Sequence, residues 1–469
     1  MNRPPADVRP AAGAPDLFGT LADEVRGVLS ERWEGRVAAV RGLTISAAGL
    51  PVPVGARCAI TTRRDGERLA EVVGLRRGET VLSVFGDATG IAPDDRVTCL
   101  SGPPRVPVGF DLLGRVLDAQ GRPLDGRPAP RLNVRYPLYA AAPPALARRP
   151  IDAPLGLGVR ALDALLTAGR GQRLGIFAGT GVGKSVLMGM ICRHTQADVN
   201  VVTLVGERGR EVGDFIRTQL GPAGLARSVV IVCTSDEPAA LRVRTCLHAT
   251  AVAEYFRDQG LDVLLMMDSL TRLAMAQRQI GLAAGEPPTA KGYPPSVFAL
   301  LPQVLERAGR THAGSITGIY TVLVEGDDID EPLADAARGI LDGHVWLSRA
   351  LANRGHYPAI DVLGSISRVA PDVTSREHQQ AALKVRRVLA TWQDIEDLVS
   401  IGAYVPGASA DYDVAVQTRS ALETFLTQSR DTGVTLEEAS AALLQLAGLI
   451  DRTYQQVTRR APGAPAARP

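Results

Sequence analysis

The sequence predicts a multidomain protein with a small N-terminal β-barrel, a central α/β domain with a mostly parallel sheet, and a C-terminal helical domain. Short β-rich runs between Gly, Pro and Asp turns fill the first hundred residues, and near-continuous apolar strands then alternate with helical patterns. Only helical patterns follow Thr374. A chain of 469 residues, 45% of them hydrophobic, can form two or three cores. We expect domains at residues 34–105, 106–376 and 377–469, after a separate start at 1–33.

The start of the chain has two parts. Residues 1–16 are rich in Pro and Ala, which predicts disorder. Apolar side chains then recur at helical spacing, at Leu17, Leu21, Val25, Val28 and Leu29. Such a stripe either packs on its own domain or docks a partner, and we expect an amphipathic docking helix. The tail RRAPGAPAARP at the other end is expected to be disordered.

The barrel prediction rests on six short runs with β-forming residues: RVAAV, LTISA, RCAIT, AEVVGL, TVLSVF and RVTCL. In the central domain, the predicted buried strands are Leu174–Phe177, Val201–Val205, Val229–Val232 and Val263–Met267. The helices expected after Thr374 cover EHQQAALKVRRVLATWQDIEDLVS, DYDVAVQTRSALETFLTQ and TLEEASAALLQLAGLIDRTYQQV.

Composition excludes several classes of protein. The net charge is only +2, and Phe85 is the only aromatic residue between Gly35 and Pro104, so we expect no nucleic-acid partner. The five scattered cysteines lack metal or disulfide spacing and indicate buried reduced thiols. Neither a signal peptide nor an apolar run of about 20 residues is present, which predicts a soluble cytoplasmic protein.

The stretch LGIFAGTGVGKSVLMG, from Leu174 to Gly189, reads as a strand, a glycine-rich turn and a helix. It matches the phosphate-binding motif GxxxxGK[ST], except that Ala178 replaces the first Gly. Backbone N–H groups of such a turn and the helix N-terminus bind phosphates, Lys184 reaches the β- and γ-phosphates, and the Ser185 hydroxyl is a Mg²⁺ ligand. The predicted nucleotide-binding residues are Gly179, Thr180, Gly181, Val182, Gly183, Lys184, Ser185 and Val186.

Two carboxylates follow predicted strands. Asp268 ends the run VLLMMD and is our candidate for holding the magnesium ion, although it could instead cap the next helix. Glu207 follows the strand Val201–Val205, at the edge where open α/β sheets place ligands, and is our candidate for activating water. The sequence therefore predicts an ATPase that uses ATP and Mg²⁺.

Beyond these motifs, three longer stretches carry a family resemblance. GERGREVGDFI, the run from Ala253 to Gly309 and the run from Gly314 to Val369 closely resemble the type III protein-export ATPases, relatives of the rotary ATP synthase catalytic subunits. The similarity extends from about Gly35 to the 450s. ADAARGILDGHVWLSR, TAKGYPP and DVLGSISRV resemble the flagellar branch more than the injectisome branch, which remains the alternative.

The resemblance implies a RecA-like ATPase core and a homohexameric ring with nucleotide between subunits. It also implies individual roles. Lys184 and Ser185 match the P-loop residues, Glu207 matches the catalytic glutamate, and Asp268 matches the magnesium-shell carboxylate. Arg208 and Arg272 match arginines near the terminal phosphate. Tyr357 matches the aromatic residue beside the adenine, and Arg368 matches the arginine finger that reaches a neighbouring subunit.

The resemblance further implies partners and a location. These are a stator protein bound by the N-terminal region, a central coiled-coil stalk protein in the ring pore, a membrane export gate, and export substrates with their chaperones. The enzyme is expected to be peripheral to the inner membrane. The Gly285–Pro295 stretch is too rich in Pro and Gly for a helix and either grips the stalk or is a plain connection. An RNA-translocating hexamer and a regulatory nucleotide-binding protein are the less favoured alternatives.

Overall fold

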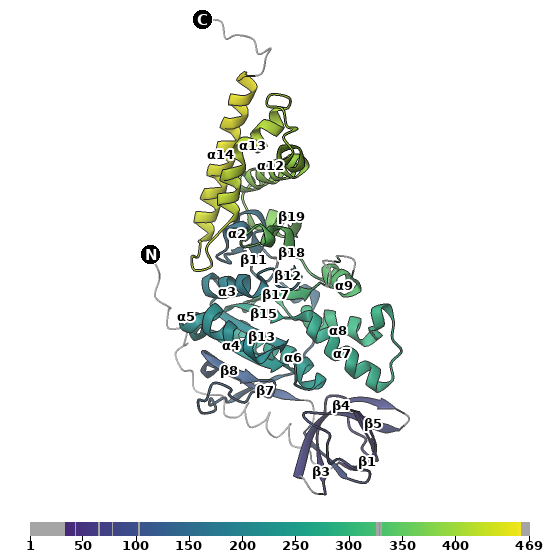
Figure 1. The fold of residues 1–469 in the computed structure, drawn as a ribbon. Helices are drawn as coiled ribbons and strands as arrows, with labels where there is room; N and C mark the ends of the chain where they lie inside the picture. The colour runs from purple at the N-terminus through teal and green to yellow at the C-terminus, as the bar shows by residue number, and fades with distance from the viewer. Residues whose placement is uncertain are drawn as a thin grey trace, which may run out of the picture. The chain divides into compact units, whose positions relative to one another are not determined.

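The computed structural model describes residues 33–460 except 43, 64–65, 77, 102–103, 325–327 and 329–330 (Figure 1). The docking helix expected at Leu17–Leu29 and the tail after residue 460 lie outside the described residues. The chain divides into two compact units. Of the described residues, the first contains those up to 149, 198–322 and 331–340, and the second contains 150–197, 323–324, 328 and 341–460.

The first unit begins with a closed six-stranded β-barrel, drawn in purple in Figure 1. Alternate side chains fill its interior, among them Val37, Ile45, Ile60 and Leu82, which is the period-2 pattern of the sequence. Closure leaves no free strand edge. The strands pair in the order β1-β2-β5-β4-β3-β6 and comprise β1 (Glu34–Arg41), β2 (Thr44–Ala48), β3 (Arg57–Thr62), β4 (Gly66–Arg76), β5 (Glu79–Val84) and β6 (Arg96–Ser101).

The same unit also contains five parallel strands in the order β17-β15-β13-β14-β8. They are β8 (Arg115–Asp118), β13 (Val199–Glu207), β14 (Ser228–Thr234), β15 (Asp262–Asp268) and β17 (Ser315–Leu323). The three central strands are the predicted apolar runs, and they are buried almost throughout. Helix α6 (Ala239–Asp258) packs on all three, and α7 (Leu270–Ala284) packs on α6 and β13.

Short elements complete this unit. An antiparallel pair, β7 (Arg105–Val108) and β9 (Val134–Pro137), follows the barrel. The Gly285–Pro295 stretch contains one 3₁₀ turn, η4 (Ala290–Gly292), before α8 (Pro295–Leu305) begins. The others are η1 (Phe110–Leu112), η2 (Ala145–Ala147), α4 (Gly209–Asp214), the π-helical η3 (Phe215–Leu220), α5 (Gly221–Ala226), β16 (Gly309–Arg310) and α9 (Pro332–Ile340).

Buried ion pairs tie this unit together internally. The Arg307 guanidinium donates to both Glu254 carboxylate oxygens at 2.8 and 2.6 Å, and to the Leu138 carbonyl at 2.8 Å. The two side chains are only 1% and 6% exposed. Glu71 of the barrel is similarly buried and accepts from Arg244 of α6 and from the Tyr139 hydroxyl. These charges are therefore satisfied inside the fold.

The second unit holds the strand and helix around the glycine-rich turn. Strand β12 (Arg173–Ala178) pairs in parallel with β18 (Gly343–Leu347), which pairs antiparallel with β19 (Ile360–Ser367). Helix α3 (Lys184–His194) follows the turn. The remaining short elements are β10 (Pro154–Leu155), α2 (Arg160–Leu165), β11 (Ala168–Gly169), α10 (Arg349–Asn353) and α11 (Ala370–Val373).

Three helices end this unit: α12 (Arg376–Ser400), α13 (Ala410–Leu426) and α14 (Leu436–Arg460). They pack side by side (Figure 1) around buried residues such as Val385, Ile395, Leu443 and Ile450. Each overlaps a helix predicted from the sequence. All five cysteines are buried free thiols. None of the helices in the described ranges is long and apolar enough to span a bilayer.

Candidate active site

The turn between β12 and α3 is shaped for phosphate. Gly181 and Gly183 have φ angles of 81° and 94°, a left-handed conformation that favours glycine. Lys184 and Ser185 form the first turn of α3, whose N-terminus favours an anion. From α10, the Arg349 guanidinium donates to the Thr180 carbonyl at 3.1 Å. The turn can therefore present backbone N–H groups to a polyphosphate, while the hydrogen bond from Arg349 anchors the Thr180 carbonyl.

A cavity of about 440 Å³ opens beside this turn within the second unit. Val186, Met190 and Leu347 give it an apolar lining, and Tyr357 forms one side. The Tyr357 ring lies so close to the turn that a Cβ on Gly183 would be 3.6 Å from it. The Tyr357 carbonyl accepts from the Gln428 N–H at 3.0 Å. An apolar cavity of this size with an aromatic side chain next to a phosphate-binding turn suits a nucleotide base.

Glu207 and Asp268 stand at the carboxyl ends of neighbouring parallel strands in the first unit. In the β13–β15 register, Asp268 pairs with Leu204, three residues before Glu207. Asp268 is buried, and one carboxylate oxygen accepts from the Thr321 hydroxyl at 2.6 Å. Ser269 caps α7 by accepting from the Arg272 N–H, so the alternative in which Asp268 is the cap is wrong. Thr321 thus fixes the Asp268 carboxylate at the end of β15.

The three candidate arginines differ in setting. Arg208 follows Glu207 directly and has a side chain 79% exposed, with its nearest carboxylate, Glu211, at 3.8 Å. Arg272 lies on α7 against Gly206, where a Cβ would approach its side-chain carbons to 3.2 Å. Its buried Nε has no hydrogen-bond partner within the part of the chain that the structure describes. Arg368 follows β19 in the second unit and is exposed.

The candidate residues thus fall into two groups. The second unit brings together the residues of the phosphate turn, including Lys184 and Ser185, and Tyr357. The first unit places Glu207, Arg208, Asp268 and Arg272 at or after the ends of β13 and β15. Sequence reasoning missed the supporting residues Arg349, Gln428 and Thr321, because each lies more than 50 residues from its partner and no motif marks it.

The available donors fit magnesium better than a softer metal. Ser185 and Asp268 offer hydroxyl and carboxylate oxygens, which Mg²⁺ prefers. Over the described ranges, the structure contains no group of three or more His, Cys, Asp or Glu placed to hold a metal. A Mg²⁺ ion bound with a nucleotide needs only one or two protein ligands, since phosphates and water supply the others.

Family models match three parts of the chain. Residues 37–101 match the β-barrel domain of the ATP synthase alpha/beta family, and residues 158–367 match its nucleotide-binding domain. Residues 374–445 match the C-terminal domain of the T3SS EscN ATPase. The three matches follow the barrel, the strands and turns of the candidate site, and the C-terminal helices.

Similar proteins cover nearly the whole chain. The flagellum-specific ATP synthase of Bacillus subtilis (strain 168) is 50% identical over 431 residues, covering 92% of this chain and 98% of that protein. The type 3 secretion system ATPase of Xanthomonas euvesicatoria is 51% identical over 422 residues, covering 90% and 95%.

Among solved structures, the assembled ATPase EscN from the enteropathogenic E. coli type III secretion system matches with a TM-score of 0.84 at 44% identity. The match covers 88% of this chain and 100% of EscN. With this fold and such extended identity, the chain belongs to the type III protein-export ATPases of the ATP synthase alpha/beta family.

Proposed function

We propose that this chain hydrolyses Mg-ATP to drive a flagellar protein-export apparatus, releasing chaperones and unfolding flagellar substrates for export. The observation that carries the proposal is the glycine-rich turn at the N-terminus of α3, which shares a cavity with Tyr357. A base site and a phosphate site placed side by side favour a nucleoside triphosphate over an isolated phosphate ion.

Each candidate residue has one task in this reaction. Lys184 binds the β- and γ-phosphates, and Tyr357 packs on the adenine. Ser185 and Asp268 would hold a magnesium ion, which would neutralise charge on the phosphate oxygens. Glu207 orients and activates the attacking water. Arg208 and Arg272 stabilise charge near the terminal phosphate, in line with the long, exposed side chain of Arg208.

Arg368 is proposed to serve the nucleotide of a neighbouring subunit. Its exposure at the end of β19 favours action outside its own subunit. A fixed guanidinium on the transition-state oxygens contributes about 10³- to 10⁵-fold in rate. The chain is therefore proposed to work as a homohexameric ring, and the solved structure of an assembled relative supports this.

Partners are proposed from the same family. A solved structure of assembled EscN in complex with its central stalk EscO supports a stalk protein in the ring pore, where the Gly285–Pro295 stretch is our candidate contact. We also propose a stator protein bound through residues 1–33, a membrane export gate, and substrates with chaperones. The enzyme is then cytoplasmic and peripheral to the inner membrane. Deleting residues 1–29 should abolish stator binding but keep ATPase activity.

The second candidate function is the injectisome ATPase, which is favoured by relatives named type 3 secretion system ATPase at 51% identity. Relatives named flagellum-specific ATP synthase are equally similar, at 50 to 52%. The flagellar proposal predicts that the gene restores motility to a strain lacking its flagellar ATPase. Restoration of needle secretion without motility would instead assign the injectisome.

Hydrolysis itself is tested by steady-state phosphate release from ATP and Mg²⁺, with molecular mass measured on the same sample. We expect turnover that rises as the ring assembles and is lost in Lys184→Ala. Lys384→Ala, on α12 outside the site, is the matched control and should keep turnover. Wild-type turnover in Lys184→Ala would contradict the assignment of the phosphate turn.

A further inference from the structure

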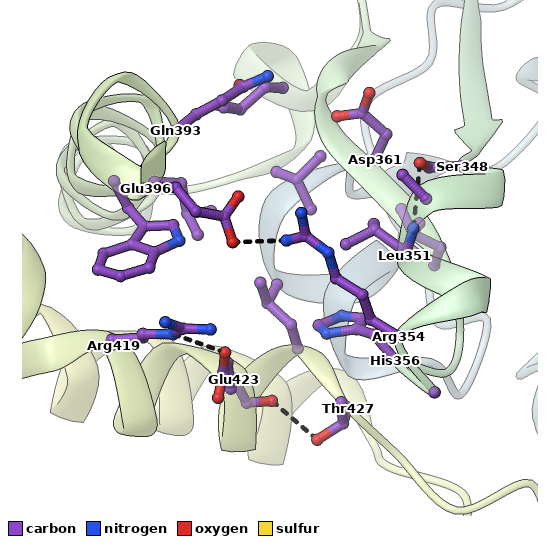
Figure 2. A pocket seen from close by; sticks show the side chains of 18 of the residues that line it. Ser348, Leu351, Arg354, His356, Asp361, Gln393, Glu396, Arg419, Glu423 and Thr427 are labelled. Carbon is purple, nitrogen blue, oxygen red and sulfur yellow. Dashed lines mark hydrogen bonds and ion pairs between the residues drawn. The ribbon is translucent and has the colours of Figure 1, made fainter. Parts of the chain in front are cut away.

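A second pocket, of about 770 Å³, lies in the second unit between the β18–β19 connection and helices α12 and α13 (Figure 2). Leu351, Ile360, Leu363, Leu389 and Leu426 supply an apolar lining. Its volume falls within the roughly 300–1,000 Å³ range of pockets that bury a small molecule. None of these residues has a role in the proposed hydrolysis.

Two ion pairs line this pocket, as Figure 2 shows: one joins the C-terminal end of α10 to α12 across it, and the other lies along α13. The Arg354 guanidinium reaches Glu396 of α12 at 2.5 Å, and the Arg419 Nε donates to Glu423 on α13 at 2.9 Å. A third carboxylate, Asp361, also lines the pocket. Asp361 interacts electrostatically with the Arg386 guanidinium, which lies beside β19, so this third carboxylate is balanced as well. Burial lowers the pKa of His356, another lining residue, although Glu423 opposes the shift. The attraction for a cation therefore rests on the exposed Glu423 carboxylate and the aromatic ring beside it.

An aromatic group adds to the attraction for cations. The Arg419 guanidinium lies over the Trp392 ring, 4.2 Å from its centroid. Rings of this kind attract ammonium and guanidinium groups. The exposed Arg419–Glu423 pair costs little to open, because solvent-exposed ion pairs contribute only about 0–1 kcal/mol. An incoming cation can therefore replace Arg419 at the carboxylate while an apolar body covers the leucines.

The pocket shares two chain segments with the proposed base cavity. In one segment, His356 lines this pocket and the next residue, Tyr357, lines the base cavity. In the other, Thr427 lines this pocket and Gln428 lines the base cavity. The Gln428 N–H donates to the Tyr357 carbonyl, which joins the two segments directly. A ligand that moves either segment therefore changes the side of the base cavity that Tyr357 forms.

We propose that this pocket binds a small cationic amphiphile, a molecule with one ammonium or guanidinium group on an apolar body, and that its binding changes the affinity for nucleotide. The second half of the proposal rests on the proposed ATPase function. By thermodynamic linkage, nucleotide must change the amphiphile's affinity by the same factor.

Dansylcadaverine is a suitable probe, because it carries a primary amine on an apolar fluorophore that accepts energy from tryptophan. With the full-length protein, we expect saturable binding with energy transfer that falls in Trp392→Phe. Glu423→Gln should weaken binding about fivefold by removing one exposed charge contact. Glu437→Gln, an exposed glutamate on the first turn of α14, is the matched control and should bind like the wild type.

Two results would overturn the proposal. Unsaturable binding would show that there is no site, and equal affinity of dansylamide, which lacks the amine, would show that the site does not select cations. Coupling is measured by titrating a fluorescent ATP analogue with and without the probe. If the probe binds but nucleotide affinity does not change, the coupling is wrong while the ATPase function stands. If the protein binds the probe but does not bind the ATP analogue, the proposed ATPase function is refuted while the amphiphile site stands.

Discussion

Charged side chains serve different purposes in two regions of this molecule. In the first unit, Arg307 and Glu254 are almost fully buried and satisfy each other with two hydrogen bonds. At the candidate site, Arg208 is largely exposed, and its nearest carboxylate lies 3.8 Å away. Because an exposed pair at that distance adds little to stability, Arg208 remains available to a ligand. Burial thus marks the Arg307–Glu254 pair as part of the fold, whereas exposure leaves the Arg208 side chain accessible for its proposed role.

The largest effect is expected from Arg368→Ala. If the exposed guanidinium of one subunit stabilises the transition state in the next, removing it should lower turnover by about 10³- to 10⁵-fold. The melting temperature should not change, since Arg368 is exposed. Phosphate release and thermal unfolding measure the two effects. A variant that unfolds easily but hydrolyses ATP normally would place Arg368 among the structural charges.

Glu207→Gln should come next. The amide keeps the shape of the side chain but cannot take a proton from water, so turnover should fall by about 10²- to 10⁴-fold while ATP binding persists. Equilibrium titration with a fluorescent ATP analogue and a turnover assay test both parts. Near-normal turnover would refute the role assigned to Glu207.

Glu254→Gln tests the structural side of the comparison. Breaking a buried ion pair leaves the Arg307 charge uncompensated and should cost about 3–5 kcal/mol of unfolding free energy. Glu423→Gln breaks an exposed pair and should cost no more than about 1 kcal/mol. Urea unfolding of both variants supplies the measurement. If the two variants lost similar amounts of unfolding free energy, burial would not decide how strongly these ion pairs stabilise the fold.

The last prediction concerns the pH dependence of stability at Asp163, a buried carboxylate that accepts hydrogen bonds from the backbone N–H groups of Leu157 and Gly158. Burial raises its pKa to about 7, so the folded state keeps a proton that the unfolded state loses near pH 4. Its contribution to stability is present below about pH 4 and is lost as the pH rises to about 7. Asp163→Asn should flatten this part of the stability profile measured by urea unfolding. If the unfolding free energy of Asp163→Asn changed with pH as steeply as that of the wild type, the raised pKa of Asp163 would be contradicted.

Local patterns made much of this fold predictable. Each of the six β-rich runs overlaps a barrel strand. Such runs can be recognised because successive side chains of a strand point alternately to the core and to solvent. The glycine-rich turn was recognisable because its whole geometry lies within Ala178–Ser185. Strand β17 was not among the predicted buried strands. It carries Gly318, where a Cβ would collide with the Tyr320 ring at 2.4 Å, so packing rather than β propensity selects that residue.

Contacts across long sequence separations could not be predicted. Arg349 reaches Thr180 and Gln428 reaches Tyr357 only after the second unit has folded. The pocket of Arg354, Glu396 and Arg419 also has no sequence motif, since three separate segments form it. The candidate site was therefore found through residues that family motifs mark, while its supports required the structure.

Mixing two inactive variants tests most directly whether catalysis is divided between neighbouring subunits. Arg368→Ala keeps Glu207, and Glu207→Gln keeps Arg368, so a mixed ring contains interfaces where an intact carboxylate faces an intact arginine finger. We expect the mixture to hydrolyse ATP well above either variant alone, and to do so only at concentrations that support assembly. A mixture as inactive as its components, in rings shown to contain both, would contradict the account.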